Sequence, residues 1–328
     1  MSATYEAVRN RAALFDFSSE SRFFVSGEEA VDAVNAMIAC DLEATSELKA
    51  LNTVVLDDSG AILAIVWVLK AEDGVWVLCD AERSELLGKR LIEFALAHNA
   101  KVDDLSETTQ CLALIGPDAL KIAMAVAGDD VIGIPYLGFE NNEQTDALLC
   151  RLGYTGEFEF RFIIPVEKAI GLRSLLIEAG AEYGLETGDP SELPLLMLEM
   201  RSLSQREHIP EGFGPIQAGI HWMVDFRKEN YPGRDAVHDQ KTNPGRKAVM
   251  LLMDVEPSIA EDKGVYIEQQ EVGRCVYSAF SPTMGKTIAL AYVDAELAWV
   301  GIIFDVAGVD ALAVSAPLFI TKTVAAVQ

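Results

Sequence analysis

The sequence predicts an α+β fold, in which an α/β body precedes a smaller all-β piece at the C-terminus. Up to about residue 245, segments with the apolar spacing of a helix alternate with short runs typical of strands. Beyond that point, short apolar segments are separated by turn residues, which is the pattern of a small β-barrel or sandwich.

Four segments of the body have the apolar face of an amphipathic helix. The first follows Gly27 and has two acidic residues in its first turn, and the others cover residues 81–98, 117–126 and 166–180. A fifth helix start is predicted at residues 189–192, where the sequence is Asp-Pro-Ser-Glu. These residues supply an N-cap acid, a proline at the first helical position and a glutamate at the third.

Strand-like runs lie between these helices, at residues 51–56, 61–70, 74–79, 110–115, 146–152 and 157–164. The run from Ala61 to Leu69 carries no charge, but it is about half as long as a membrane-spanning helix must be. Its β-branched and aromatic content predicts a fully buried strand instead. Glu72-Asp73-Gly74 predicts a hairpin to the next strand, because Asp-Gly is a favoured turn pair.

The charge balance argues against several kinds of partner. The 328 residues include 26 Lys and Arg against 51 Asp and Glu, a formal net charge of −25. Proteins that bind nucleic acid or anionic membranes supply cations, so we expect neither partner. The N-terminal segment has no apolar signal core, and the five cysteines are widely spaced, so we expect a cytoplasmic protein without disulfides. The four histidines lack the close spacing of paired metal ligands, so we predict no metal site.

Two glycine-containing motifs invite a functional interpretation. Gly285-Lys286-Thr287 looks like the end of a phosphate-binding loop, but that motif needs a glycine where Phe280 stands. We therefore predict a plain turn there. In Gly153-Tyr154-Thr155-Gly156, an exposed tyrosine ring could stack on a planar ligand, although the spacing alone favours a hairpin turn with a solvent-facing tyrosine.

Five segments, taken in order, carry a resemblance to a known family. They are residues 5–18, 25–27, 153–157, 214–236 and 272–290, of which Gly-Tyr-Thr-Gly-Glu at 153–157 is the most specific. In these segments the chain resembles the aminomethyltransferase family of the glycine cleavage system, the T-proteins and their tetrahydrofolate-using relatives.

The resemblance implies a three-part, ring-like assembly of a ferredoxin-like α/β body and a C-terminal β-barrel. The body would cover residues 1–243 as two intertwined subdomains, the second at roughly 50–140, and the barrel would cover 244–328. A reduced folate, tetrahydrofolate, would lie in the central hole.

The resemblance also implies the residues that contact the folate, namely Leu78, Asp80, Tyr154 and Arg161. Tyr154 would pack against the pterin and Asp80 would contact its polar edge. Arg161 stands where the family has a glutamate that hydrogen-bonds the amino-pyrimidine edge, and an arginine cannot accept those bonds. Near Leu193, the chain also lacks a family arginine.

The catalytic position departs from the family as well. T-proteins carry an aspartate where this chain has Ala64, and shifting the alignment by one residue offers only Leu63 or Ile65. The catalytic residue is therefore unknown, with Asp80, Tyr154 and His208 as candidates. Glu211 and Trp222 lie in segments that approach the site in relatives, so we expect them to contact a small-molecule substrate.

Three functions stay open on this basis. The first is transfer of a methyl or aminomethyl group with tetrahydrofolate as acceptor or donor. The second is a repurposed enzyme acting on a non-folate anion, because the guanidinium of Arg161 favours a carboxylate or phosphate. Its competing structural explanation is a surface ion pair of Arg161 with Glu157 or Glu159. The third is a noncatalytic binding protein, consistent with Ala64. The donor, pathway and oligomeric state stay open too.

Overall fold

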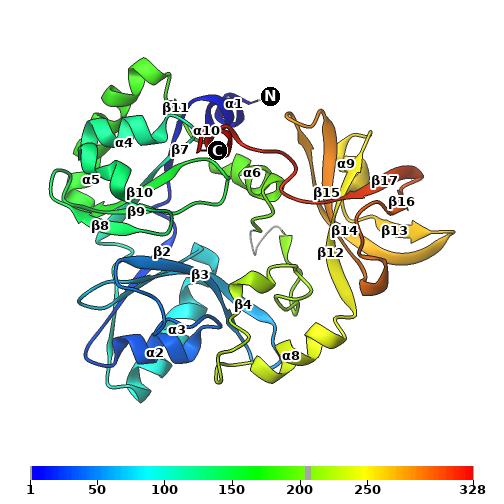
Figure 1. Ribbon diagram of the computed structural model, residues 1–328, viewed down its shortest axis with the longest axis horizontal. Helices are drawn as coiled ribbons and strands as arrows, with labels where there is room; N and C mark the ends of the chain where they lie inside the picture. The colour runs from blue at the N-terminus through cyan, green and yellow to red at the C-terminus, as the bar shows by residue number, and fades with distance from the viewer. Residues whose placement is uncertain (1, 204–207, 328) are drawn as a thin grey trace.

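The computed structural model describes residues 2–203 and 208–327 as three units arranged around a common centre (Figure 1). Two are sheets covered by helices and the third is a closed barrel. This is the predicted α+β fold with its ring-like arrangement. None of the described helices combines the length and apolar character that crossing a membrane requires.

The first sheet is mixed, because its edge strand β11 runs parallel to β1 and the other pairs are antiparallel. In spatial order its strands are β11 (Glu186–Thr187), β1 (Ala13–Asp16), β7 (Thr109–Ile115), β10 (Glu159–Pro165), β9 (Ala147–Arg151) and β8 (Phe139–Asn142). Helices α4 (Ala119–Ala127) and α5 (Val166–Gly180) pack on one face over Phe160 and Phe162. Side chains alternate along a strand, so Glu159 and Arg161 point to the other face, toward the centre.

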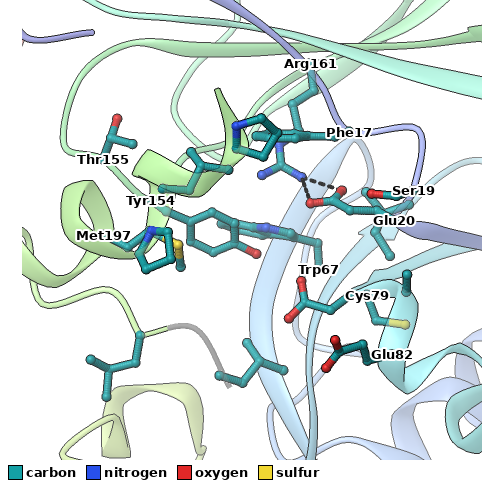
Figure 2. Close-up of a pocket in the computed structure, with 18 of the residues that line it drawn as sticks. Phe17, Ser19, Glu20, Trp67, Cys79, Glu82, Tyr154, Thr155, Arg161 and Met197 are labelled. Atoms are coloured by element: carbon teal, nitrogen blue, oxygen red, sulfur yellow. Dashed lines mark hydrogen bonds and ion pairs between the residues drawn. The ribbon is translucent and has the colours of Figure 1, made fainter. Parts of the chain in front are cut away.

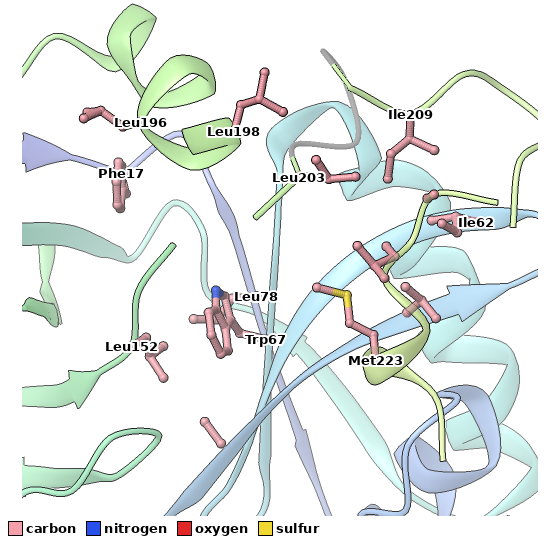
Figure 3. Packing of buried hydrophobic residues seen from close by; sticks show 14 of the residues in the cluster. Phe17, Ile62, Trp67, Leu78, Leu152, Leu196, Leu198, Leu203, Ile209 and Met223 are labelled. Carbon is pink, nitrogen blue, oxygen red and sulfur yellow. The ribbon is translucent and has the colours of Figure 1, made fainter. Parts of the chain in front are cut away.

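The second sheet is antiparallel and has the same two-sided construction. Its spatial order is β3 (Lys49–Leu56), β4 (Ile62–Lys70), β5 (Val75–Cys79), β2 (Ser21–Ser26) and β6 (Lys101–Asp104). Helices α2 (Ala30–Met37) and α3 (Ser84–Ala97) lie on the outer face, where Val66 and Val68 are buried. Trp67 and Leu78 belong instead to the central core, which Figure 3 shows together with Phe17.

The barrel closes in the order β12 (Arg246–Met253), β15 (Lys286–Asp294), β14 (Gln270–Ser281), β13 (Gly264–Ile267), β16 (Ile303–Val306) and β17 (Val309–Val314). The remaining helices are α1 (Ala3–Asn10), α6 (Leu193–Glu199), α8 (Arg234–Thr242), α9 (Pro257–Ala260) and α10 (Lys322–Val327). Arg9 of α1 and Thr323 of α10 both reach the turn at residues 155–157, so these two helices lie near the same part of the first sheet (Figure 1). The proposed division near residue 243 stays a prediction.

Several local predictions are confirmed. Asp189 accepts a hydrogen bond from the Ser191 amide at 2.9 Å, and a single 3₁₀ turn then leads into α6. Gly285, with φ +64°, lies in the hairpin between β14 and β15, so the Gly-Lys-Thr motif is a turn. The Asp-Gly pair closes the β4–β5 hairpin, where the Ala71 amide donates to the Gly74 carbonyl.

A buried carboxylate, Glu199 at the end of α6, joins α1 to the barrel. It accepts hydrogen bonds from the Tyr5 hydroxyl at 2.7 Å and from the Arg9 guanidinium at 2.8 Å, both on α1. It also accepts one from the Ser281 hydroxyl of the barrel at 2.5 Å. Because Glu199 is fully buried, this cluster holds the barrel against the body.

Candidate functional site

A cavity of about 710 Å³ lies where the inner faces of the two sheets meet. The second sheet contributes Trp67 and Leu78, and the first contributes Arg161. Helix α6 and Tyr277 of the barrel close other sides. The volume is in the range of sites that bind small molecules.

Aromatic rings form one wall of this cavity (Figure 2). The centroids of the Trp67 and Tyr154 rings are 5.2 Å apart at an interplanar angle of 43°. Tyr154 lies in the glycine-flanked turn between β9 and β10, where Gly156 has φ +76°. Burial raises the pKa of the Tyr154 phenol well above its usual range, so this hydroxyl stays protonated at neutral pH.

Arg161 is fully buried at the back of the cavity. Its Nε donates to Glu159 at 2.7 Å, and its Nη1 donates to Glu20 at 2.9 Å. The guanidinium carbon lies 4.7 Å from the Phe17 ring centroid and 5.3 Å from that of Tyr154. Burial opposes the charge, but Glu20 and Glu159 outweigh it and hold the pKa of Arg161 above its usual range.

These contacts correct the expectation of a surface ion pair at Arg161. The pairing with Glu159 is present, but both side chains are buried, whereas Glu157 lies 3.8 Å from Arg9 instead. Alternation along β10 places residues 159 and 161 on the same inner face, and that face is covered by the other units.

Carboxylates dominate the polar lining, which includes Asp16, Glu20, Asp80, Glu82 and Glu159. Arg161 is the one Lys or Arg among the described lining residues. Burial raises the pKa of Glu20 to about 7 although Arg161 opposes the shift, and Asp80 and Glu159 add to it. Asp80 and Glu82 are exposed, so they stand at the mouth of the cavity.

The structure brings together all four residues predicted to contact the folate. Leu78, Asp80, Tyr154 and Arg161 line this one cavity, together with Leu193. Their contact with a folate stays a prediction.

The strand that should carry the family's catalytic aspartate presents an apolar side chain. Ala64 is fully buried in the core beneath helices α2 and α3, so it faces away from the cavity. The neighbouring position that lines the cavity is Ile65. The residue of β4 that faces the cavity is therefore the one obtained by shifting the family alignment from Ala64 to Ile65, and it provides no carboxylate.

Three further candidates lie outside the lining of this cavity. His208 is buried with its ring edge-on to Tyr277, at a centroid separation of 4.8 Å. Burial lowers the pKa of His208 to about 3, so the ring is neutral at physiological pH. Glu211 is exposed, and Trp222 is 53% exposed.

Sequence reasoning missed Glu20 and Trp67. Glu20 lies in the turn before β2 and meets Arg161 across 141 positions of the chain, a contact that no local pattern announces. Trp67 had a signal in the alternation of the buried run 62–70, which places residues 65 and 67 on one face.

Comparison with known families decides the relationship. A family model described as the GCVT N-terminal domain matches residues 1–228, and one described as the glycine cleavage T-protein C-terminal barrel domain matches residues 246–319. The chain belongs to the glycine cleavage T-protein family.

Relatives within the T-protein family are named aminomethyltransferases. The protein from Caldanaerobacter subterraneus is 28% identical over 302 residues, covering 90% of this chain and 81% of the relative. The protein from Thermotoga neapolitana is 29% identical over 292 residues, covering 88% of this chain and 80% of the relative. The crystal structure of glycine cleavage system aminomethyltransferase T from Bartonella henselae matches with a TM-score of 0.89 at 22% identity, over 98% of this chain and 90% of that one.

Proposed function

We propose that this protein transfers a one-carbon group, methyl or aminomethyl, with tetrahydrofolate as acceptor or donor in the central cavity. Membership of the T-protein family and relatives named aminomethyltransferases support this activity. The position of Leu78, Asp80, Tyr154 and Arg161 around one cavity supports the folate as ligand.

The observation that carries the proposal is the charge of the lining. The lining carries five carboxylates and one guanidinium, and two of the carboxylates already pair with it. The amino-pyrimidine edge of a pterin presents N–H donors, and carboxylates are the side chains that only accept when ionised. The same charge balance argues against a carboxylate or phosphate held inside the cavity, so a repurposed site for a non-folate anion is the weaker proposal.

Aromatic and acidic residues have separate roles in this scheme. The ring of Tyr154 would stack on the bicyclic ring, with Leu78 packing beside it. Glu20 would accept the ring N–H groups in place of the missing family glutamate. Asp80 at the mouth would contact the outer polar edge.

The residue that transfers a proton stays unassigned, with Asp80, Tyr154 and His208 as the candidates. Glu20 would hold the amino-pyrimidine edge, whereas the nitrogen that bonds to the one-carbon unit lies at the other end of the bicyclic ring. His208, neutral and outside the lining, is the poorest candidate of the three. Contacts of Glu211 and Trp222 with the donor substrate stay predictions.

A noncatalytic binding protein is the second candidate function. The observation that favours it is Ile65, which gives the cavity face of β4 no acid.

The deciding experiment is an anaerobic calorimetric titration with tetrahydrofolate and 5-formyltetrahydrofolate. We expect micromolar binding by the unmodified protein, and a loss of at least about tenfold in Tyr154→Ala because a stacking ring is removed. Tyr266→Ala, on β13 of the barrel and outside the lining, is the matched control and should bind normally. Absence of binding at millimolar ligand would contradict the proposal. Turnover with methyl or aminomethyl donors then separates an enzyme from a binding protein.

A further inference from the structure

Two buried N–H donors on the wall of the central cavity have no acceptor among the described residues. They are Nε1 of Trp67 and Nη2 of Arg161. Both side chains line the cavity, and they are 3% and 0% exposed. A buried donor without an acceptor destabilises the folded protein, so such groups point to a partner that the protein itself does not supply.

Two nitrogens of the Arg161 guanidinium have carboxylate partners, and the third, Nη2, has no acceptor among the described residues. Glu159 binds Nε and Glu20 binds Nη1, which fixes the plane of the group between the Phe17 and Tyr154 rings. Nη2 is therefore a fixed donor, and the carboxylate of Glu20 lies beside the same guanidinium. A ligand that reaches Nη2 therefore meets this N–H donor and, close to it, the Glu20 carboxylate as an acceptor.

Tyr154 packs against both donors. Its ring centroid lies 5.2 Å from that of Trp67 and 5.3 Å from the Arg161 guanidinium carbon. Figure 2 shows the Tyr154 ring in front of Trp67 and below Arg161. Tyr154 also borders a second cavity of about 510 Å³, which Met200 and Phe319 line as well.

We propose that Trp67 and Arg161 are specificity residues, whose N–H groups bind a carbonyl oxygen of the ligand once the Tyr154 ring has moved off them to stack on the face of the ligand. Glu20 accepts the adjacent ring N–H, so the site selects a fused heteroaromatic ring that carries a lactam, –NH–C(=O)–. This inference rests on the proposed function for the kind of ring system, and it adds which edge of the ring is recognised and by which residues.

A matched ligand pair tests the inference. Folic acid and aminopterin are pteridines that differ in the lactam: aminopterin has an amino group in place of the C4 oxygen, and its N3 carries no hydrogen. We expect calorimetry to show folic acid binding at least about tenfold more tightly, because an amino group cannot accept from the two donors.

The variants assign this preference to residues. Trp67→Phe keeps an aromatic ring and removes the N–H, so it should weaken folic acid about fivefold and aminopterin less than about twofold. Trp76→Phe, a half-buried tryptophan on β5 outside the lining, is the control and should keep the full preference. Arg161→Lys should abolish the preference, and thermal melting reports whether that variant folds.

The outcomes separate the two proposals. If the unmodified protein binds folates but does not distinguish the pair, or if Trp67→Phe keeps the full preference, the donor pair is wrong and the folate proposal stands. If it binds neither pteridine nor tetrahydrofolate, both proposals are contradicted.

Discussion

At the scale of single residues, a buried arginine held by two carboxylates sets the chemistry of the central cavity. The sequence alone suggested that Arg161 would attract an anion. In the structure, the carboxylates of Glu20 and Glu159 already pair with Arg161. The other carboxylates of the lining then make the cavity acidic. The physical reason is desolvation, since a buried guanidinium requires partners that remain in place when no ligand is bound.

The raised pKa of Glu20 predicts how folate binding depends on pH. If the ionised carboxylate accepts ligand N–H groups, binding requires deprotonation and weakens below the pKa of about 7. Affinity for 5-formyltetrahydrofolate should then fall about tenfold between pH 8 and pH 6, while Glu20→Gln gives a weaker but flat profile. Calorimetry at pH 6, 7 and 8 measures both. Parallel profiles for the two proteins would show that another group is responsible.

The buried His208 predicts a sensitivity of the fold to acid. Its pKa is about 3 in the folded protein against 6.5 ordinarily, so between these values the unfolded chain binds a proton that the native protein excludes. Stability should therefore fall with pH below about 6.5, by about 2 kcal/mol between pH 6.5 and 5 from this group. His208→Phe, which keeps the edge contact with Tyr277, should lack this part of the loss. Urea unfolding at pH 7 and pH 5 compares the two proteins.

At the scale of elements, alternation along β4 predicts losses of stability of different size when aspartate replaces Ala64 or its neighbour Ile65. Ala64→Asp buries a carboxylate in the apolar core under α2 and α3, and it should lower the free energy of unfolding by at least about 3 kcal/mol. Ile65→Asp faces the cavity, where water and ligand have access, and should cost about 1 kcal/mol. Urea unfolding measures both. Equal losses would mean that the strand register is wrong.

The elements also show what local sequence can predict. The helix at residues 166–180 was predicted at the ends it has, because its apolar spacing and terminal glycine are local signals. The short strands β1, β2, β6 and β8 were not predicted, since each is four to six residues long and depends on pairing with distant strands. The same limit applies to the site. Tyr154 came from a local motif, whereas the Glu20–Arg161 pair is a product of the tertiary fold.

At the scale of the whole molecule, stability depends on the cluster around Glu199. Glu199→Gln leaves Arg9 with less compensation in a buried position, so it should lower the free energy of unfolding by about 3 kcal/mol. Ser281→Ala removes one neutral donor and should cost about 1 kcal/mol. The double variant Arg9→Met/Glu199→Gln should lose less than the sum of its single variants, because no buried charge is stranded. Additive losses in urea unfolding would contradict coupling between the two residues.

The two ends of the chain hold the turn that carries Tyr154. Arg9 donates to the Thr155 carbonyl at 2.6 Å, the Thr321 hydroxyl donates to the Gly156 carbonyl at 2.7 Å, and the Thr323 hydroxyl donates to Glu157 at 2.6 Å. During synthesis on the ribosome, the contact of Arg9 with Thr155 can form once residue 155 has emerged. The contacts of Thr321 and Thr323 can form only when those later residues have emerged as well. The turn that carries Tyr154 is therefore completed only after both sheets and the barrel strands have left the exit tunnel.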